Sequence, residues 1–168
     1  MPYRRKYYKR TPNKDKYSIE QTIINVPPSE QWTEFPAASP IAASRQWAIS
    51  VIPPTELQGT RKVKHFTLSF SSQDINALIY YSLIFVPAGY EPQRINIPET
   101  GFAAPAYDAN QFIISQGVLD FTGGPLRIKS PLSRNLNSGD SIYLVFAHTG
   151  AAVQQGLFAT VRYAITLQ

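Results

Sequence analysis

KVKHFTLSFS, residues 62–71, carries the clearest structural pattern in this chain. Within it, apolar side chains alternate with hydroxyl side chains, and this period of two is typical of a β-strand with one buried face. The apolar positions predicted to face a core are Phe66, Leu68 and Phe70. The segment therefore predicts one strand of a sheet that covers a hydrophobic core.

The rest of the chain is divided into short segments by fourteen prolines and nine glycines, and no long stretch has a helical period with caps. Seven further strands are predicted, at residues 17–26, 46–52, 77–86, 111–119, 126–129, 141–148 and 156–167. The segment 77–86 is apolar on both faces, which predicts a central strand packed from both sides or across a subunit contact. Residues 87–110 predict an extended loop with a short strand at 94–97.

Eight strands with long, uneven connections indicate a two-sheet jelly roll rather than an up-and-down barrel, whose strands are joined by short hairpins. The expected fold class is therefore all-β, an eight-stranded jelly roll of two packed antiparallel sheets. A chain of 168 residues is long enough to bury roughly 70% of its unfolded surface within one domain. We expect this domain to span residues 17–168 and residues 1–16 to form a short basic arm, either disordered or extended.

The excess positive charge of the chain lies in MPYRRKYYKRTPNKDK, residues 1–16. Seven cations against the single acid Asp15 give this arm a net charge of +6, whereas the other 152 residues carry nine cations and ten acids. Three tyrosines lie among the cations, and aromatic rings of this kind stack on bases. The predicted nucleic-acid-binding residues of the arm are Tyr3, Arg4, Arg5, Lys6, Tyr7, Tyr8, Lys9, Arg10, Lys14 and Lys16.

The charge of the arm admits several interpretations: a nucleic-acid tether, a nuclear localisation signal, a membrane-surface segment, or a run that only maintains solubility. The membrane interpretation is the weakest, because the spacing gives no apolar helical face. As a tether, an arm that neutralises about six phosphates of a single strand gives log affinity a slope of about −4 against log salt. Phosphate contacts do not read base identity, so we expect binding that is indifferent to sequence.

A second basic set lies within the predicted strands, and in a jelly roll those strands share one sheet with the first strand. Its members are Arg61, Lys62, Lys64, Arg127, Lys129 and Arg162. One interpretation makes the outer face of that sheet a shallow floor for nucleic acid beneath the arm. The other is that these are ordinary solvated strand faces with lysines protecting sheet edges. The sequence favours neither.

The residues that catalysis or metal binding requires are scarce in this sequence. The chain has no cysteine, and its two histidines, His65 and His148, have no neighbours at ligand spacing. Asp108, Asp120 and Asp140 each lie beside turn residues, and turn chemistry accounts for them. No G-x-S-x-G motif and no phosphate-loop frame is present. We therefore expect that the protein is not an enzyme and that it holds no cofactor or metal. The longest apolar run, residues 77–88, is too short to span a membrane.

Beyond the Tyr/Arg arm, five further segments resemble one group of viral proteins. They are GTRKVKHFTLSF (59–70), LIYYSLIFVPAGY (78–90), NQFIISQGVLD (110–120), PLRIKSPLSRNLNSGDSIYLVF (125–146) and VRYAITLQ (161–168). Together they resemble the capsid proteins of small circular Rep-encoding single-stranded DNA viruses, the circovirus-like and nanovirus-like CRESS-DNA viruses. The resemblance covers the arm and residues 45–168, and it is strongest in the R-K-V-K strand and in S-P-L-S-R-N-L-N-S-G-D.

The resemblance implies an eight-stranded viral jelly roll in which the first, eighth, third and sixth strands form one sheet. It implies sixty identical subunits in a T=1 icosahedral shell around circular single-stranded DNA, located in the virion and, during assembly, in the host nucleus. Basic arms of such proteins face the interior and direct import through the host nuclear import machinery. This arm is shorter than in many circovirus-like proteins, which weakens the match of charge between the arms and a whole genome.

Four aromatic residues in proline-rich loops are expected to be exposed in a single subunit and buried between subunits: Trp32, Phe35, Phe102 and Tyr107. The alternative function is a non-assembling single-stranded nucleic-acid-binding or nuclear-shuttle protein with a β-barrel body. That alternative predicts aromatic side chains on an exposed sheet face. A third class, a hydrolase or ligand-binding cupin, needs a histidine or carboxylate cluster that the sequence lacks.

Overall fold

The computed structural model describes residues 16–35, 44–72, 79–92, 112–148 and 156–167, with no side-chain description for 33–35, 44 and 45. These residues form nine strands and one short 3-10 helix, η1 (Ser29–Gln31). The strands are β1 (Ser18–Val26), β2 (Thr33–Phe35), β3 (Ser44–Ile52), β4 (Arg61–Ser72), β5 (Ile79–Val86), β6 (Phe112–Leu119), β7 (Leu126–Leu136), β8 (Ser141–His148) and β9 (Leu157–Leu167).

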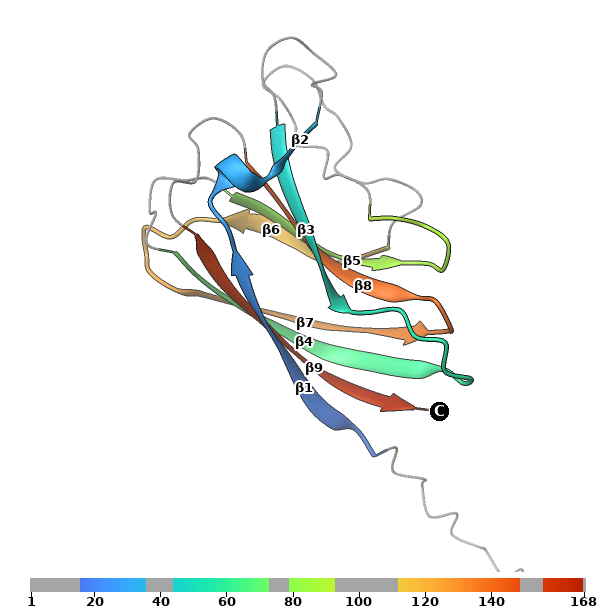
Figure 1. Ribbon diagram of the computed structural model, residues 1–168. Coiled ribbons are helices and arrows are strands. Elements are labelled where there is room, and N and C mark those ends of the chain that lie inside the picture. The colour runs from blue at the N-terminus through green and yellow to red at the C-terminus, as the bar shows by residue number, and fades with distance from the viewer. Residues whose placement is uncertain (1–15, 36–43, 73–78, 93–111, 149–155, 168) are drawn as a thin grey trace, which may run out of the picture.

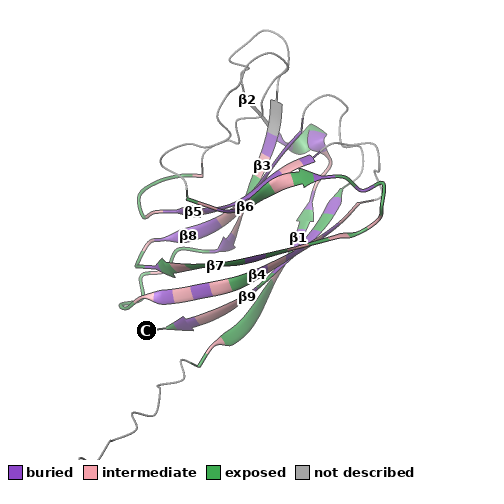
Figure 2. Cartoon of the chain, turned by 180° about the vertical axis from the view of Figure 1, so that it is seen from behind, coloured by how far each residue is buried: buried purple, intermediate pink, exposed green. Residues whose placement is uncertain are grey.

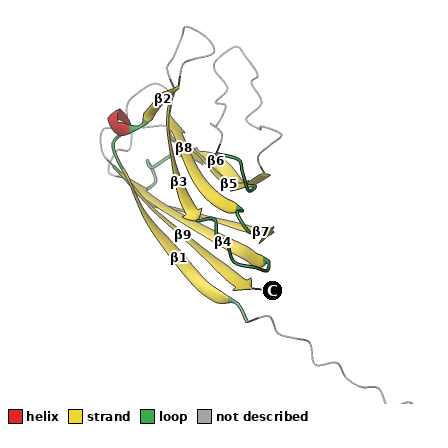
Figure 3. Ribbon diagram, turned by 45° about the vertical axis from the view of Figure 1, so that its right-hand side comes forward, coloured by secondary structure: helices red, strands yellow, loops and turns green. Residues whose placement is uncertain are grey.

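The strands form two antiparallel sheets that pack face to face (Figures 1 and 3). The four-stranded sheet has the order β1-β9-β4-β7, and the other has the order β2-β3-β8-β5-β6. Eight long strands thus make two four-stranded layers, and the short β2 extends one of them. This confirms the all-β, jelly-roll-like sandwich that the sequence predicts, including the pairing of the first, eighth, third and sixth predicted strands in one sheet.

The core lies between the two sheets and is built largely from alternate residues of the strands. Phe66, Leu68 and Phe70 are each at most 1% exposed, which confirms the inward face predicted from their spacing. The ring of Phe70 contacts Tyr81 and Phe146 of the opposite sheet, at centroid distances of 5.2 and 6.0 Å. Figure 2 shows the resulting alternation of buried and less buried residues along β4.

The strand β7 is longer than predicted, because it runs through Pro131 to Leu136 rather than ending at residue 129. Proline lacks a backbone donor and is tolerated on edge strands, and β7 pairs only with β4 at the edge of its sheet. The strand β2 was not predicted from the sequence. The short strand expected at 94–97 lies outside the described residues.

The expectation that Trp32 is exposed in a single subunit is wrong. Its side chain is only 3% exposed and belongs to the core of the single subunit. Its indole nitrogen Nε1 donates a hydrogen bond to the carbonyl of Pro27 at 2.8 Å, and its ring lies 6.5 Å from that of Phe146. The side chains of the other three aromatic residues expected at subunit interfaces, Phe35, Phe102 and Tyr107, lie outside the described residues.

The strand β5 lies between β8 and β6 and is buried on both faces, as its apolar sequence predicts. Its inward residues join the core, and its outward residues join a second apolar cluster on the far side of the sheet. The buried members of this second cluster are Ile84, Val86, Val145 and Ala147. Tyr80, Ile113 and Tyr143 pack against them and are partly buried.

Candidate nucleic-acid interface

The outer face of the β1-β9-β4-β7 sheet collects most of the basic residues predicted within the strands. Alternation fixes this arrangement, because the neighbours of inward residues such as Val63, Leu68 and Val161 point outward. The cations at outward positions are Lys62, Lys64, Arg127, Lys129 and Arg162, which we call the basic face. The structure therefore brings together five of the six residues of this set, from three different strands.

The strand register places these cations in rows across the sheet. Thr67 of β4 pairs with Arg162 of β9 on one side and with Lys129 of β7 on the other. In the next row, Ser69 lies between Thr160 and Arg127. Neighbouring strands are about 4.8 Å apart, so Arg162 and Lys129 are separated by about 10 Å of backbone, with hydroxyl side chains between them.

Lys64 connects the basic face to the start of β1. Its Nζ lies 3.6 Å from the ring centroid of Tyr17, which is a cation–π contact. Lys16 is exposed and directly precedes this tyrosine, and β1 is an edge strand of the sheet. The described chain thus begins beside the basic face, and the rest of the arm is joined to it there. Arm residues Tyr3, Arg4, Arg5, Lys6, Tyr7, Tyr8, Lys9, Arg10 and Lys14 lie outside the described residues.

Arg61 is the member of the predicted set that does not join the basic face. It is 8% exposed, and its guanidinium donates hydrogen bonds to the carbonyl of Pro53 at 3.2 Å and to the carbonyl of Asp140 at 3.1 Å. Arg61 has the same strand parity as Val63, so its side chain points inward. We therefore correct the expectation for this residue, which is buried and donates hydrogen bonds to two backbone carbonyls.

The carboxylates of the described residues lie elsewhere, so the outward positions of the basic sheet carry no negative charge in the part of the chain that is described. Glu20, on β1, accepts a hydrogen bond from the inward-facing Tyr163 hydroxyl at 3.3 Å, and burial raises the pKa of that tyrosine. Asp120 and Asp140 lie in turns at other strand ends. Because the described outward positions of this sheet carry cations and no acid, this face has a positive charge that suits a polyanion.

The turn aspartates behave as turn chemistry predicts. Asp120 Oδ1 accepts hydrogen bonds from the Thr122 N–H at 3.0 Å and from its hydroxyl at 2.7 Å, and both lower the pKa of the carboxyl. Asp140 accepts from the backbone N–H groups of Ala88 and Asn137, at 3.0 and 2.8 Å. Asp108 lies outside the described residues.

Exposed apolar side chains on the same face were not predicted as site residues. Phe158 of β9 is 44% exposed, and Ile19 and Ile23 of β1 are each 63% exposed. Their outward positions follow from the register, because Asn25 pairs with Phe158 and Ile23 pairs with Thr160. The signal in the sequence was the alternation along residues 157–167. It places Phe158 on the face of the strand that points away from the core.

The described residues include no group of three or more histidine, aspartate or glutamate side chains placed to hold a metal ion. In the same part of the chain, no helix has the length and hydropathy needed to cross a membrane.

Comparisons with known proteins add no functional assignment. No family model matches this sequence, and no curated protein matches it. Among solved structures, the chain is similar to a CocE/NonD family hydrolase from Staphylococcus aureus, with 9% sequence identity and a TM-score of 0.28. The match covers 92% of this chain and 37% of the hydrolase, so the chain spans little more than a third of that protein's length. At this similarity, the likeness carries no argument about activity.

Proposed function

We propose that this chain is a viral capsid protein that assembles into a T=1 icosahedral shell of sixty copies and packages circular single-stranded DNA. The proposed role is structural and requires neither catalysis nor a cofactor. Its partners are further copies of itself, the DNA and, for entry to the nucleus, the host import machinery. The protein would be found in the virion and, during assembly, in the host nucleus, without insertion into a membrane.

One observation supports the proposal most strongly: the basic face and the attachment point of the arm lie on the same sheet. Five cations point outward from β4, β7 and β9, and Lys16 precedes β1 at the edge of that sheet. A shell subunit needs one surface directed at the nucleic acid, and a polycation joined to that surface adds to its phosphate contacts. The resemblance of the sequence to CRESS-DNA capsid proteins supplies the class of polyanion and the symmetry.

Measuring the salt dependence of single-stranded DNA binding tests the role of the basic face. We expect the full chain carrying Arg127→Gln, Lys129→Gln and Arg162→Gln to bind oligo(dT) more weakly. Each phosphate contact on a single strand contributes about 0.7 to the slope of log affinity against log salt, so losing three contacts lowers its magnitude by about 2.

A control with the same net charge separates local contacts from overall charge. Ala48→Glu, Gln58→Glu and Gln116→Glu are exposed positions outside the basic sheet, and they also lower the net charge by three. We expect this variant to keep a slope close to that of the unmodified chain. Equal slopes for the two triple variants would contradict a direct role of the basic face.

The exposed side chain of Phe158 favours a second candidate function. An aromatic side chain that is 44% exposed on a cationic sheet face is what a non-assembling single-stranded nucleic-acid-binding or nuclear-shuttle protein requires. Both functions use the same surface to bind DNA, and only the capsid forms closed particles. Electron microscopy of the purified chain distinguishes the two directly.

A further inference from the structure

We infer that the basic sheet binds unpaired nucleotides in two ways, with phosphates on its cations and bases stacked on Phe158 beside Ile23. This inference rests on the proposed function, in that it takes nucleic acid to be the ligand of this face. It goes further by naming a base-stacking site and by assigning to the body of the protein, not only to its arm, a preference for single strands over duplexes.

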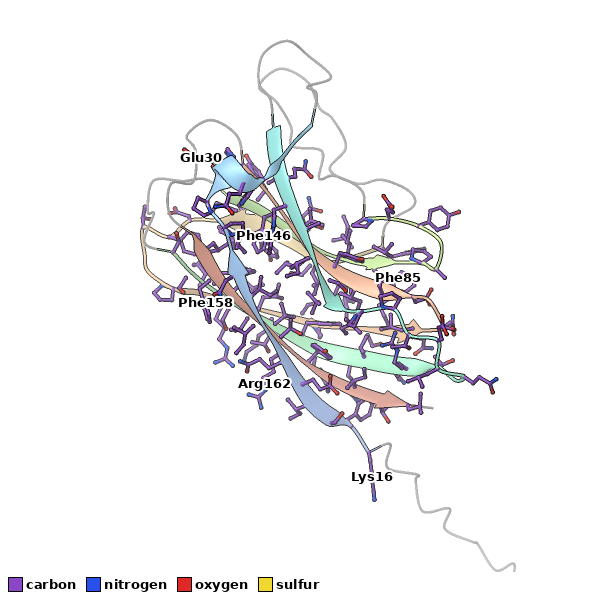
Figure 4. All side chains as sticks on the ribbon, in the orientation of Figure 1. Lys16, Glu30, Phe85, Phe146, Phe158 and Arg162 are labelled. Atoms are coloured by element: carbon purple, nitrogen blue, oxygen red, sulfur yellow. The ribbon has the colours of Figure 1, made fainter. Side chains whose placement is uncertain are left out.

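The position of Phe158 supports a stacking site. Its side chain points away from the core on the outer side of β9, on the same side of the sheet as Arg162 (Figure 4). Its strand neighbours on this face are Asn25 of β1 and Ser71 of β4, both short polar residues. A ring flanked by short side chains leaves one of its faces accessible to a planar partner.

Ile23 enlarges this apolar site. It pairs with Thr160, which is two residues along β9 from Phe158, so Ile23 and Phe158 are diagonal neighbours on one face. Diagonal neighbours of antiparallel strands lie about 7–8 Å apart, within reach of an aromatic side chain. Single exposed apolar residues are common on protein surfaces, but adjacent ones on a face that also carries five cations indicate an amphipathic ligand.

The cations lie at a suitable distance for the same strand of nucleic acid. Arg162 is four residues from Phe158 along β9, a backbone distance of about 13 Å at about 3.3 Å per residue. Arg127 lies one row from Phe158 and two strands away. Long arginine side chains cover part of these separations, so an extended strand can place phosphates on the arginines while one of its bases meets the ring.

The apolar residues also distinguish single strands from duplexes. A duplex keeps its base faces stacked inside and offers an open sheet only phosphates and groove edges. An unpaired base offers a π-face, which every base possesses, so stacking on Phe158 does not depend on sequence. A surface of cations alone would bind both forms of DNA by charge, whereas the ring adds affinity only for strands with free bases.

Affinity measurements with two probes of equal charge test the inference. The probes are fluorescent oligo(dT) and an abasic oligomer with the same number of phosphates, and the proteins are the full chain and its Phe158→Ala variant. Stacking makes a contribution of roughly five- to hundredfold in affinity per base. We expect Phe158→Ala to weaken oligo(dT) binding within this range, leave the abasic oligomer unaffected, and be rescued by Phe158→Tyr.

Phe112→Ala serves as the matched control, because Phe112 is 45% exposed and belongs to the other sheet. It is expected to leave the affinity for both probes unchanged. Equal affinity of Phe158→Ala and the unmodified chain for oligo(dT) would overturn the stacking site, while binding of both probes would leave the proposed function intact. If neither probe bound the unmodified chain even at low salt, the proposed function would fail as well.

A measurement on the unmodified chain keeps the test independent of how the variant folds. Oligonucleotides carrying 5-iodouracil crosslink under ultraviolet light to aromatic residues that stack on them, and peptide mass spectrometry locates the crosslink. We expect a crosslink at Phe158. Crosslinks confined to the tyrosines of residues 1–16 would overturn the inference. A Phe158→Ala variant that changes sedimentation but not DNA binding would overturn it too, because Phe158 would then belong to a contact between copies.

Discussion

Arg61 and Lys62 are adjacent in the sequence and serve opposite surfaces, because successive residues of a strand point to opposite faces. Lys62 is on the basic face, whereas Arg61 is buried and donates hydrogen bonds to the carbonyls of Pro53 and Asp140. Counting by twos from the inward residues Phe66 and Leu68 would place Arg61 on the outward face. The count fails because β4 is bulged between Lys64 and Phe66. Arg61 lies two residues from the apolar Val63, and this spacing was the signal in the sequence that both side chains share one face.

The carboxylate of Asp140 is the centre of the turn between β7 and β8, and its loss is expected to destabilise the fold. Its two oxygens accept hydrogen bonds from the N–H groups of Ala88 and Asn137, and the residue is 6% exposed. In Asp140→Asn, one oxygen becomes an amide group that cannot accept, so one partly buried N–H loses its partner. We expect the free energy of unfolding to fall by about 1–3 kcal/mol in urea denaturation.

Asp120→Asn is the control for this substitution. Asp120 is exposed and accepts hydrogen bonds from Thr122 within its own turn. Water can replace those contacts, so we expect a much smaller change in the free energy of unfolding. Equal stability losses for the two variants would show that Asp140 does not have the structural role assigned to it.

At the scale of the strand, the bulge in β4 is the feature that periodicity could not predict. Pairing with β7 shifts register between Lys64 and Phe66, and His65 adopts a φ of 58° there. A bulge adds a residue to one strand only, so it depends on the partner strand and leaves no period in the sequence. The regular stretches before and after it were predictable, because burial there follows a period of two.

Substitutions at His65 are expected to reverse the usual order of strand preference. In a regular strand, valine is favoured over glycine, but a left-handed conformation costs an L-residue roughly 1–2 kcal/mol and costs glycine little. We therefore expect His65→Gly to be more stable than His65→Val by about 1 kcal/mol or more in chemical denaturation.

Thr67 provides the comparison within the same strand. It lies on the outward face of β4, where pairing resumes after the bulge, with Arg162 on one side and Lys129 on the other. There we expect the ordinary order, with Thr67→Val more stable than Thr67→Gly. If valine were preferred at both positions, the left-handed conformation of His65 would not describe the protein in solution.

At the scale of the whole molecule, the two sheets present chemically different outer surfaces. The β1-β9-β4-β7 sheet carries the basic face, whereas β2, β3, β5, β6 and β8 together contain two residues of the Lys, Arg, Asp and Glu types, Glu34 and Arg45, which have opposite charges. The second apolar cluster lies on the outer side of that second sheet. A subunit with one cationic side and one nearly uncharged side is suited to a shell that separates DNA from its exterior.

This polarity could be predicted only in part from the sequence. The segregation of charge into residues 1–16 was visible directly, and so was the alternation that builds each strand. The basic face combines positions from 62 to 162, and they become neighbours only because β4 pairs with β9 on one side and with β7 on the other. Strand order is a property of long-range pairing, so the sequence supplied it through resemblance to a viral jelly roll and not through any local pattern.

Cryo-electron microscopy of the purified, expressed chain tests the capsid proposal most directly, because one reconstruction reports both assembly and orientation. We predict closed particles of uniform diameter with sixty subunits, in which the β1-β9-β4-β7 sheet and residue 16 face an interior that contains nucleic acid. Subunits that remain monomeric with and without single-stranded DNA would contradict the proposal. So would closed particles whose basic face and amino terminus lie on the outer surface.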